Sequence, residues 1–378
     1  MPVALVNGRV LTPAGIVHGQ AVLIEDGLIV RLAPSRDIPG DAERVDLDGR
    51  LLAPGYIDTQ VNGGGGVLFN DAPTVEAIAA IGEAHRAYGT TGFLPTLISD
   101  DLSVVDKAMR AVEAAIDQGV PGVLGVHIEG PFLNPQRKGI HDEGKFRVLD
   151  EDAIALLASL KRGKTLVTLA PERTTGETIA RLARAGVVVA AGHTNARYAT
   201  MRQALDSGLT GVTHLFNAMS PLTSREPGVV GAVLENQTAY AGIIVDGRHV
   251  DPVTLKIALR ARPLDRFMLV TDAMPTVGMA DKRFVLQGRE IVVRDGVCVD
   301  EAGTLAGSDL DMAAAVRNAI ALLGLSLEDA VMMASAAPAA FLGLTGRRGG
   351  IAPGHAADLV LLDDDLRVLR TWIDGAAR

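Results

Sequence analysis

The spacing of apolar residues divides the chain into parts with different patterns. Residues 1–52 contain short alternating stretches, such as residues 21–24 and 28–32, and the pair Asp26 and Gly27 between them favours a hairpin turn. From Ala53 onward, strand-length apolar runs alternate with long Ala-rich amphipathic stretches. This alternation is typical of repeated βα units that build a parallel sheet.

Eight strand candidates follow one another in this second part, which is the number that closes a (β/α)8 barrel. They cover residues 55–61, 92–97, 123–128, 165–169, 187–191, 211–215, 241–245 and 267–271. Apolar residues three to four apart predict helices between them, over residues 74–88, 102–118 and 198–207. We therefore predict an α/β fold with a TIM-like barrel domain over residues 53–343.

The end of the chain departs from this pattern. Residues 283–299 alternate around Asp295 and Gly296, which predicts a β-hairpin inserted before helices at 309–323 and 327–337. Residues 344–378 then return to strand-like runs. Because chain ends often lie close together, we predict that residues 1–52 and 344–378 form one small β-sandwich domain.

Composition and charge narrow the possible partners. The chain is 48% apolar but only 3% aromatic, and its formal net charge is -9 with no basic stripe, so a nucleic-acid partner is not expected. No apolar run approaches the length of a membrane span, and the N-terminus lacks the pattern of a signal peptide. Cys298 is the single cysteine, which excludes an intramolecular disulfide. We expect a cytoplasmic protein without a membrane partner.

Ionisable side chains stand at the predicted carboxyl ends of four strands, namely Glu129, His193, His214 and Asp272. Each could by itself be structural, as a solvated carboxylate or an imidazole bonded to the backbone. In a barrel, however, these strand ends meet at the face where active residues cluster. A carboxylate and two imidazoles suit one divalent ion that keeps positions open for water and substrate. We predict this metal site, with Asp272 as a nearby carboxylate that moves protons and His127 as an inward barrel residue rather than a ligand.

Five short motifs surround these residues. They are His-Ile-Glu-Gly-Pro-Phe-Leu-Asn from residue 127, Ala-Gly-His-Thr-Asn from 191, Thr-His-Leu-Phe-Asn-Ala-Met from 213, Val-Asp-Gly-Arg-His from 245 and Val-Thr-Asp-Ala-Met from 270. Together they resemble the N-acetylglucosamine-6-phosphate deacetylase family of the amidohydrolase superfamily. The resemblance covers nearly the whole chain. It implies hydrolysis of the N-acetyl group of a phosphorylated amino sugar to glucosamine 6-phosphate and acetate, in amino-sugar metabolism.

The resemblance also implies roles for individual residues. Glu129, His193 and His214 would bind one divalent ion, expected to be zinc, with Fe2+ or another divalent ion as alternatives. Asp272 would take a proton from the attacking water and return it to the departing nitrogen, while His141 would polarise the acetyl carbonyl. The substrate would be bound by Ile140, His141, Asn217, Ala218, Arg225, His249, Leu305, Ala306 and Gly307. A homodimer is implied, in which Arg225 and His249 could reach the neighbouring site with charge for the phosphate.

The chain departs from many amidohydrolases in its first barrel strand. Those proteins carry a His-x-His pair for a second metal, whereas this chain has Gln60, Val61 and Asn62. We therefore expect a mononuclear site, with Gln60 contacting the metal through water.

Other functions on the same scaffold stay open. A deacetylase for the galactosamine epimer, an aminoacylase, a dihydroorotase or a deaminase could share the fold, because fold does not decide chemistry. A non-catalytic barrel that binds a sugar phosphate is a further alternative. The intact ligand set and Asp272 count against it.

Overall fold

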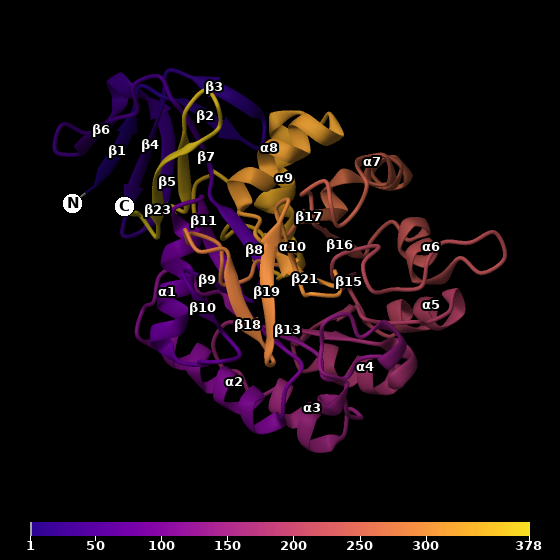
Figure 1. Ribbon diagram of the computed structural model, residues 1–378. Helices are drawn as coiled ribbons and strands as arrows, with labels where there is room; N and C mark the ends of the chain where they lie inside the picture. Colours follow the sequence, from indigo (N-terminus) through magenta and orange to yellow (C-terminus); the bar gives the residue numbers. More distant parts are fainter. Residues whose placement is uncertain (1) are drawn as a thin grey trace.

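The computed structural model describes residues 2–378. A parallel sheet of eight strands, in the order β17-β16-β15-β14-β13-β12-β11-β8, winds into a barrel with helices around it (Figure 1). Its strands are β8 (Tyr56–Val61), β11 (Thr90–Ile98), β12 (Gly125–Glu129), β13 (Lys164–Leu169), β14 (Val188–Ala191), β15 (Gly211–Val212), β16 (Tyr240–Ile243) and β17 (Phe267–Leu269). The predicted α/β fold with a TIM-like barrel is confirmed.

The barrel closes where the two ends of this sheet, β17 and β8, meet. The amide of Asp272 donates a hydrogen bond to the carbonyl of Gln60 at 3.0 Å. Val61 and Ala273 form an isolated parallel bridge beside it. Closure therefore happens just beyond β17, at the carboxyl ends of both strands.

Asp58 on β8 is fully buried beside this closure. Its carboxylate accepts hydrogen bonds from the hydroxyl of Thr271 at 2.5 Å, from the amide of Thr271 at 3.3 Å and from the amide of Gln60 at 3.1 Å. Burial raises the pKa of Asp58 to about 7, although these hydrogen bonds oppose part of the shift. A side chain that can be protonated therefore ties the first strand to the last.

Burial explains why the apolar runs became strands and helices. Every residue of β8 and β11 is buried, as expected for parallel strands covered on both faces. On α2 the buried side chains include Val105, Met109 and Val112, which share one face at the spacing of three to four. The hydroxyl of Thr74 caps α1 by accepting from the amide of Ala77.

Within residues 2–378 the helices are α1 (Val75–Arg86), α2 (Leu102–Asp117), α3 (Glu151–Leu157), α4 (Gly176–Arg184), α5 (Tyr198–Asp206), α6 (Gly228–Glu235), α7 (Pro252–Ala261), α8 (Met312–Leu323), α9 (Leu327–Ala334) and α10 (Ala336–Phe341). None of these combines the length and the apolar character that crossing a bilayer requires.

The helix predicted over 327–337 is broken at Ser335, whose hydroxyl donates to the carbonyl of Val331 at 2.6 Å. Pro338 lies in the first turn of α10 and has no amide hydrogen to extend α9.

Both chain ends build two further sheets, of order β5-β4-β1-β6 and β24-β23-β22-β7-β2-β3. Their strands are β1 (Val3–Val6), β2 (Arg9–Thr12), β3 (Gly15–His18), β4 (Gln20–Glu25), β5 (Leu28–Pro34), β6 (Glu43–Asp46), β7 (Leu51–Pro54), β22 (Leu359–Leu362), β23 (Val368–Ile373) and β24 (Ala376–Ala377). Leu5, Val22, Leu359 and Trp372 are buried in one shared apolar cluster. In Figure 1 the yellow C-terminal strands lie among the indigo N-terminal ones. β7 crosses the predicted boundary at residue 53, and the domain limits stay a prediction.

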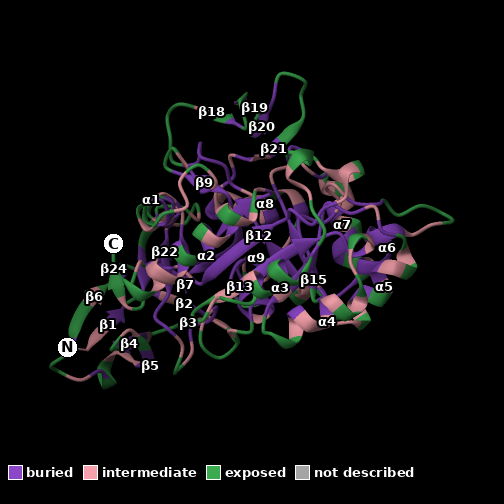
Figure 2. Cartoon of the chain, turned by 90° about the horizontal axis from the view of Figure 1, so that it is seen from below, coloured by how far each residue is buried: buried purple, intermediate pink, exposed green. Residues whose placement is uncertain are grey.

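The predicted hairpin at 283–299 belongs to a larger four-stranded sheet made by β18 (Arg283–Leu286), β19 (Arg289–Arg294), β20 (Val297–Val299) and β21 (Leu305–Ser308). β21 was not predicted, because its Leu-Ala-Gly-Ser sequence is short and rich in small residues. Figure 2 shows this sheet standing above one end of the barrel. A small hairpin of β9 (Gly63–Gly64) and β10 (Val67–Leu68) follows β8.

Candidate metal centre

The four predicted site residues lie at the carboxyl ends of barrel strands. Glu129 is the last residue of β12, whereas His193, His214 and Asp272 follow β14, β15 and β17. These last three have left-handed backbones, with φ of 48°, 29° and 53°. Such conformations are costly outside glycine and cluster at functional sites. The strands predicted over 211–215 and 267–271 end earlier than expected, at Val212 and Leu269.

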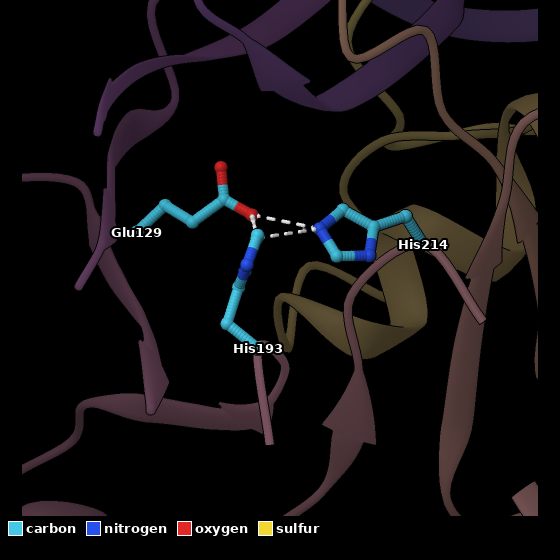
Figure 3. A group of neighbouring side chains, drawn as sticks. All are labelled: Glu129, His193 and His214. Atoms are coloured by element: carbon cyan, nitrogen blue, oxygen red, sulfur yellow. Dashed lines mark hydrogen bonds and ion pairs between the residues drawn. The ribbon is translucent and has the colours of Figure 1, made fainter. Parts of the chain in front are cut away.

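Glu129, His193 and His214 point toward one another (Figure 3). The distance is 3.0 Å from Glu129 Oε1 to His214 Nε2, 3.3 Å from Glu129 Oε1 to His193 Nε2, and 3.1 Å between the two Nε2 atoms. All three side chains are buried. Bonds of about 2.0–2.1 Å to a tetrahedral ion would place such atoms about 3.3–3.4 Å apart, so the three residues fit one divalent ion.

The charges of this group also fit a cation. Burial alone would raise the pKa of Glu129, yet hydrogen bonds to His193 and His214 lower it well below its ordinary range. Burial works against a charged His214 as well, but the carboxylate of Glu129 raises the pKa of this imidazole. An ionised carboxylate therefore faces two imidazole nitrogens in a buried space.

Asp272 lies beside this group and is held by two amide side chains. Its Oδ1 accepts from Asn62 Nδ2 at 2.7 Å and from Gln60 Nε2 at 3.1 Å. Gln60 Nε2 also lies 3.1 Å from Glu129 Oε1. Burial raises the pKa of Asp272 to about 6, with the charge of Glu129 acting in the same direction. Gln60 therefore bridges two carboxylates, and its water-mediated metal contact stays a prediction.

Hydrogen bonds assign the tautomers of two rings near the centre. His193 Nδ1 lies 2.9 Å from the carbonyl of Arg137, so Nδ1 carries a proton and Nε2 is the nitrogen that faces Glu129. The amide of Ser99 donates to His141 Nδ1 at 3.3 Å, so Nε2 of that ring carries its proton. Burial lowers the pKa of His141 to about 3. His141 is thus a neutral hydrogen-bond donor, and its ring centre lies 4.4 Å from that of His193.

His127 lies inside the barrel, as predicted. Its Nε2 is 2.8 Å from the hydroxyl of Thr168 and its Nδ1 is 3.3 Å from that of Thr96. Burial lowers the pKa of His127 to about 4. The ring is bonded to neutral hydroxyls and does not belong to the group of possible metal ligands.

A cavity of about 360 Å³ opens at the metal centre, a size that suits a small molecule. Glu129, His193, His214 and Asp272 line it. So do eight of the nine residues predicted to bind substrate, namely Ile140, His141, Asn217, Ala218, His249, Leu305, Ala306 and Gly307. The ninth, Arg225, lies exposed between β15 and α6 and is not among the lining residues.

His249 is held by Asp246 of the same motif. Its Nδ1 lies 2.6 Å from Asp246 Oδ2, and both side chains are buried. Asp246 Oδ1 also accepts from the amides of Arg248 and His249, at 2.8 and 2.9 Å. Burial alone would raise the pKa of Asp246, but His249 lowers it below the ordinary value. His249 lines the cavity of its own chain, and its contact with a neighbouring site stays a prediction.

Several residues of the site were not identified from the sequence. Asn62 lines the cavity, and Arg137 is the only Arg or Lys among the lining residues. Ser99 orients His141 from the end of β11. Arg137 directly precedes the Lys138-Gly139-Ile140-His141 segment, which contains two of the predicted substrate-binding residues. This position was the only sequence signal that could have indicated Arg137 as a site residue.

Comparison with known proteins agrees with this geometry. Residues 51–377 match the model of the "Amidohydrolase family", and residues 3–52 match that of the "NagA composite domain". The N-acetylgalactosamine-6-phosphate deacetylase of Shewanella sp. (strain ANA-3) is 44% identical, over 98% of this chain and 94% of its own length.

Solved structures are similar over the full length. That of N-acetylglucosamine-6-phosphate deacetylase from Pasteurella multocida is 34% identical, covers 100% of both chains and has a TM-score of 0.96. The enzyme of the same name from Mycobacterium smegmatis, solved as a mutant in complex with N-acetyl-D-glucosamine-6-phosphate, is also 34% identical. It covers 100% of this chain and 99% of its own, with a TM-score of 0.90. The chain therefore belongs to the amidohydrolase family, among the deacetylases of phosphorylated amino sugars.

Proposed function

We propose that this chain hydrolyses the N-acetyl group of N-acetyl-D-glucosamine 6-phosphate to D-glucosamine 6-phosphate and acetate. The observation that carries the proposal is that a metal-ligand group and a separate proton acceptor, Asp272, line one cavity of small-molecule size. Amide hydrolysis needs both a Lewis acid and a group that moves protons. Relatives of similar length carry this activity in their names.

Glu129, His193 and His214 would hold one divalent ion, for which we propose zinc, with Fe2+ or another divalent ion as alternatives. When bound, the ion supplies Lewis-acid chemistry to the attacking water and to the acetyl carbonyl. The protein contributes a charged ligand set that Arg137 and Gln60 hold in place.

Asp272 moves the proton in this proposal. Its Oδ1 is engaged by Asn62 and Gln60, which leaves Oδ2 to accept the proton of the attacking water. The same oxygen then delivers this proton to the departing sugar nitrogen, as the carbon-nitrogen bond breaks. His141 donates from Nε2 to the acetyl oxygen, because its Nδ1 is occupied by Ser99.

The phosphate of the substrate needs donors in a chain of net charge -9. His249, paired with Asp246, supplies one from the same chain, with the amide of Ala218 and the side chain of Asn217 nearby in the cavity wall. Arg225 lies outside the cavity on the segment between β15 and α6, where a loop projects from the molecule (Figure 1). We propose that Arg225 serves the neighbouring site of a homodimer.

An exposed apolar surface supports the dimer. Leu222, Val253 and Ile257 are 57%, 62% and 60% exposed, and Leu222 and Ile257 line one groove with Phe216 and Val230. Clustered exposed apolar side chains commonly mark protein interfaces. Sedimentation equilibrium of the protein should show a dimer, and Ile257→Asp should shift it to the monomer. A monomeric wild type at micromolar concentration would refute this assembly.

The galactosamine epimer is the second candidate substrate. The relative that is 44% identical is named for N-acetylgalactosamine 6-phosphate, whereas two solved structures that are 34% identical and cover the whole chain are named for the glucosamine compound. The two sugars differ at one hydroxyl and share the phosphate and the acetamide. The ratio of kcat/KM for the two sugars will therefore decide between these candidates.

We further propose a cytoplasmic location. Cys298 is the only cysteine, and it is buried, so the fold has no disulfide that requires an oxidising compartment. Recovery of the protein with the periplasmic or secreted fraction of its host cells would contradict this location.

The experiment for the main proposal is acetate release from N-acetylglucosamine 6-phosphate by zinc-loaded protein. The galactosamine epimer and unphosphorylated N-acetylglucosamine are run in the same assay. Release that depends on the phosphate would support the reaction and the anion site together. If protein that holds one metal ion releases no acetate from either phosphorylated sugar, the proposed function is wrong.

A further inference from the structure

Glu172 lies outside the catalytic group but joins three loops at the carboxyl end of the barrel. It belongs to the short 3-10 helix η4 (Pro171–Arg173) that follows β13. Glu172 Oε1 accepts from Asn134 Nδ2 at 2.7 Å and from the amide of Asn195 at 2.6 Å, and Oε2 accepts from the hydroxyl of Thr194 at 2.5 Å. These donors come from the loops after β12 and β14, on either side of β13 in the sheet.

The two clamped loops carry metal-centre residues. Thr194 and Asn195 directly follow His193, whose carbonyl accepts from the amide of Asn134 at 2.9 Å. Arg137, in the other loop, accepts from His193 Nδ1 through its carbonyl and donates from Nε to Asn195 Oδ1 at 3.0 Å. The two loops are therefore bonded to each other around the His193 ring, and Glu172 holds both.

The contacts that Glu172 makes are short and charge-assisted, which makes them stronger than bonds between neutral groups. They support His193 where its backbone is left-handed, with φ of 48°. A strained conformation persists only where surrounding contacts hold it. If Glu172 is removed, its three donors in Asn134, Thr194 and Asn195 lose their shared acceptor. The backbone of His193 would then be free to relax.

We propose that Glu172 is a positioning residue of the metal centre, which fixes His193 and the loop that ends at His141 relative to each other. β13 supplies none of the three possible metal ligands. Glu172, which follows β13, would instead contribute to the site by holding the neighbouring loops. The inference rests on the proposed metal centre but not on the choice of sugar substrate. It predicts that Glu172 sets metal affinity and ligand geometry without touching metal or substrate.

The test measures the metal centre directly. Metal-free protein is titrated with Co2+, whose visible absorption spectrum reports the arrangement of its ligands. Outer partners of metal ligands typically contribute about 10- to 100-fold to affinity, so Glu172→Ala should raise the dissociation constant for Co2+ about 10-fold or more and alter the spectrum. Glu172→Gln keeps an acceptor for the amide of Asn195 and should recover part of the loss.

Glu177→Gln is the matched control, because Glu177 is exposed on α4 nearby and pairs with Arg184 at 2.9 Å. It should bind Co2+ as the wild type does. If Glu172→Ala does not fold, Thr194→Val carries the test, since it removes the hydroxyl that donates to Oε2. Wild-type affinity and spectrum in folded Glu172→Ala, or in Thr194→Val where Glu172→Ala does not fold, would overturn the proposal. A wild type that binds no Co2+ would instead refute the metal centre and, with it, the proposed function.

Discussion

Replacing Asp272 by asparagine separates its proposed chemistry from its place in the fold. Asparagine keeps the size of the side chain, and its oxygen can still accept from Asn62 and Gln60, which now donate to Oδ1 at 2.7 and 3.1 Å. It also tolerates the left-handed backbone, where φ is 53°. The main-chain bonds to Gln60 and Ser308 do not involve the side chain. The variant should therefore fold and bind metal like the wild type.

What the substitution removes is the oxygen that accepts the proton. A positioned general acid-base residue contributes about 100- to 10,000-fold to rate. Each tenfold corresponds to about 1.4 kcal/mol of activation free energy, so kcat should fall at least about 100-fold, which raises the activation free energy by about 2.8 kcal/mol. The change should appear in kcat, because the substrate-binding residues of the cavity wall are unchanged.

The assay is acetate release at saturating substrate, with metal content measured on the same protein preparation. Asp265→Asn is the control, because Asp265 is an exposed carboxylate that pairs with Arg266 just before β17. It should retain wild-type kcat. A kcat for Asp272→Asn within about threefold of the wild type, at full metal occupancy, would refute the proposed proton transfer. Loss of metal from the Asp272→Asn variant would instead indicate that Asp272 is a metal ligand.

Three further outcomes follow from the structure. Because the raised pKa of Asp58 makes the folded state hold a proton that the unfolded state releases, wild-type stability should fall by about 3 kcal/mol between pH 4 and 7. Asp58→Asn should lack this loss, and urea unfolding of metal-free protein that shows a constant difference between the two proteins across this range would contradict it. His214→Ala should lower metal stoichiometry, whereas His127→Ala should not, since His127 is hydrogen-bonded to the hydroxyls of Thr168 and Thr96 and is not one of the possible ligands. Equal metal occupancy in the two variants would mean that the metal binds elsewhere. Asp246→Asn should raise KM for the phosphorylated sugar about 10-fold with little change in kcat, and an equal effect on the unphosphorylated sugar would show a purely structural role.

The sequence predicted the barrel and the metal-ligand group because both depend on local signals. Strand-length apolar runs recur along the chain, and Glu129, His193 and His214 stand at their ends. In a barrel, a residue at the carboxyl end of a strand lies at the same face as the residues that end the other strands. That is why residues 85 positions apart, Glu129 and His214, could be placed together before any contact was known.

Other features depend on contacts that have no local signature. Glu172 looks like an ordinary turn carboxylate until the fold brings Asn134 and Asn195 to it from two other loops. β21 is recognisable only through its pairing with β20, because its own residues are small. The exposed position of Arg225 depends on how the segment between β15 and α6 is folded, which periodicity does not specify.

The closure of the barrel bears on how this enzyme can change over evolution. The bond from Asp272 to Gln60 joins the first strand to the last, so the residues proposed for proton transfer are also part of the seam. Substitutions there alter architecture and chemistry at once. Leu305, Ala306 and Gly307 line the same cavity from a separate four-stranded sheet. Substitutions that change the substrate preference should therefore be tolerated more readily on that sheet. Substitutions at the closure between Asp272 and Gln60 should be tolerated less, because they would also affect the reaction.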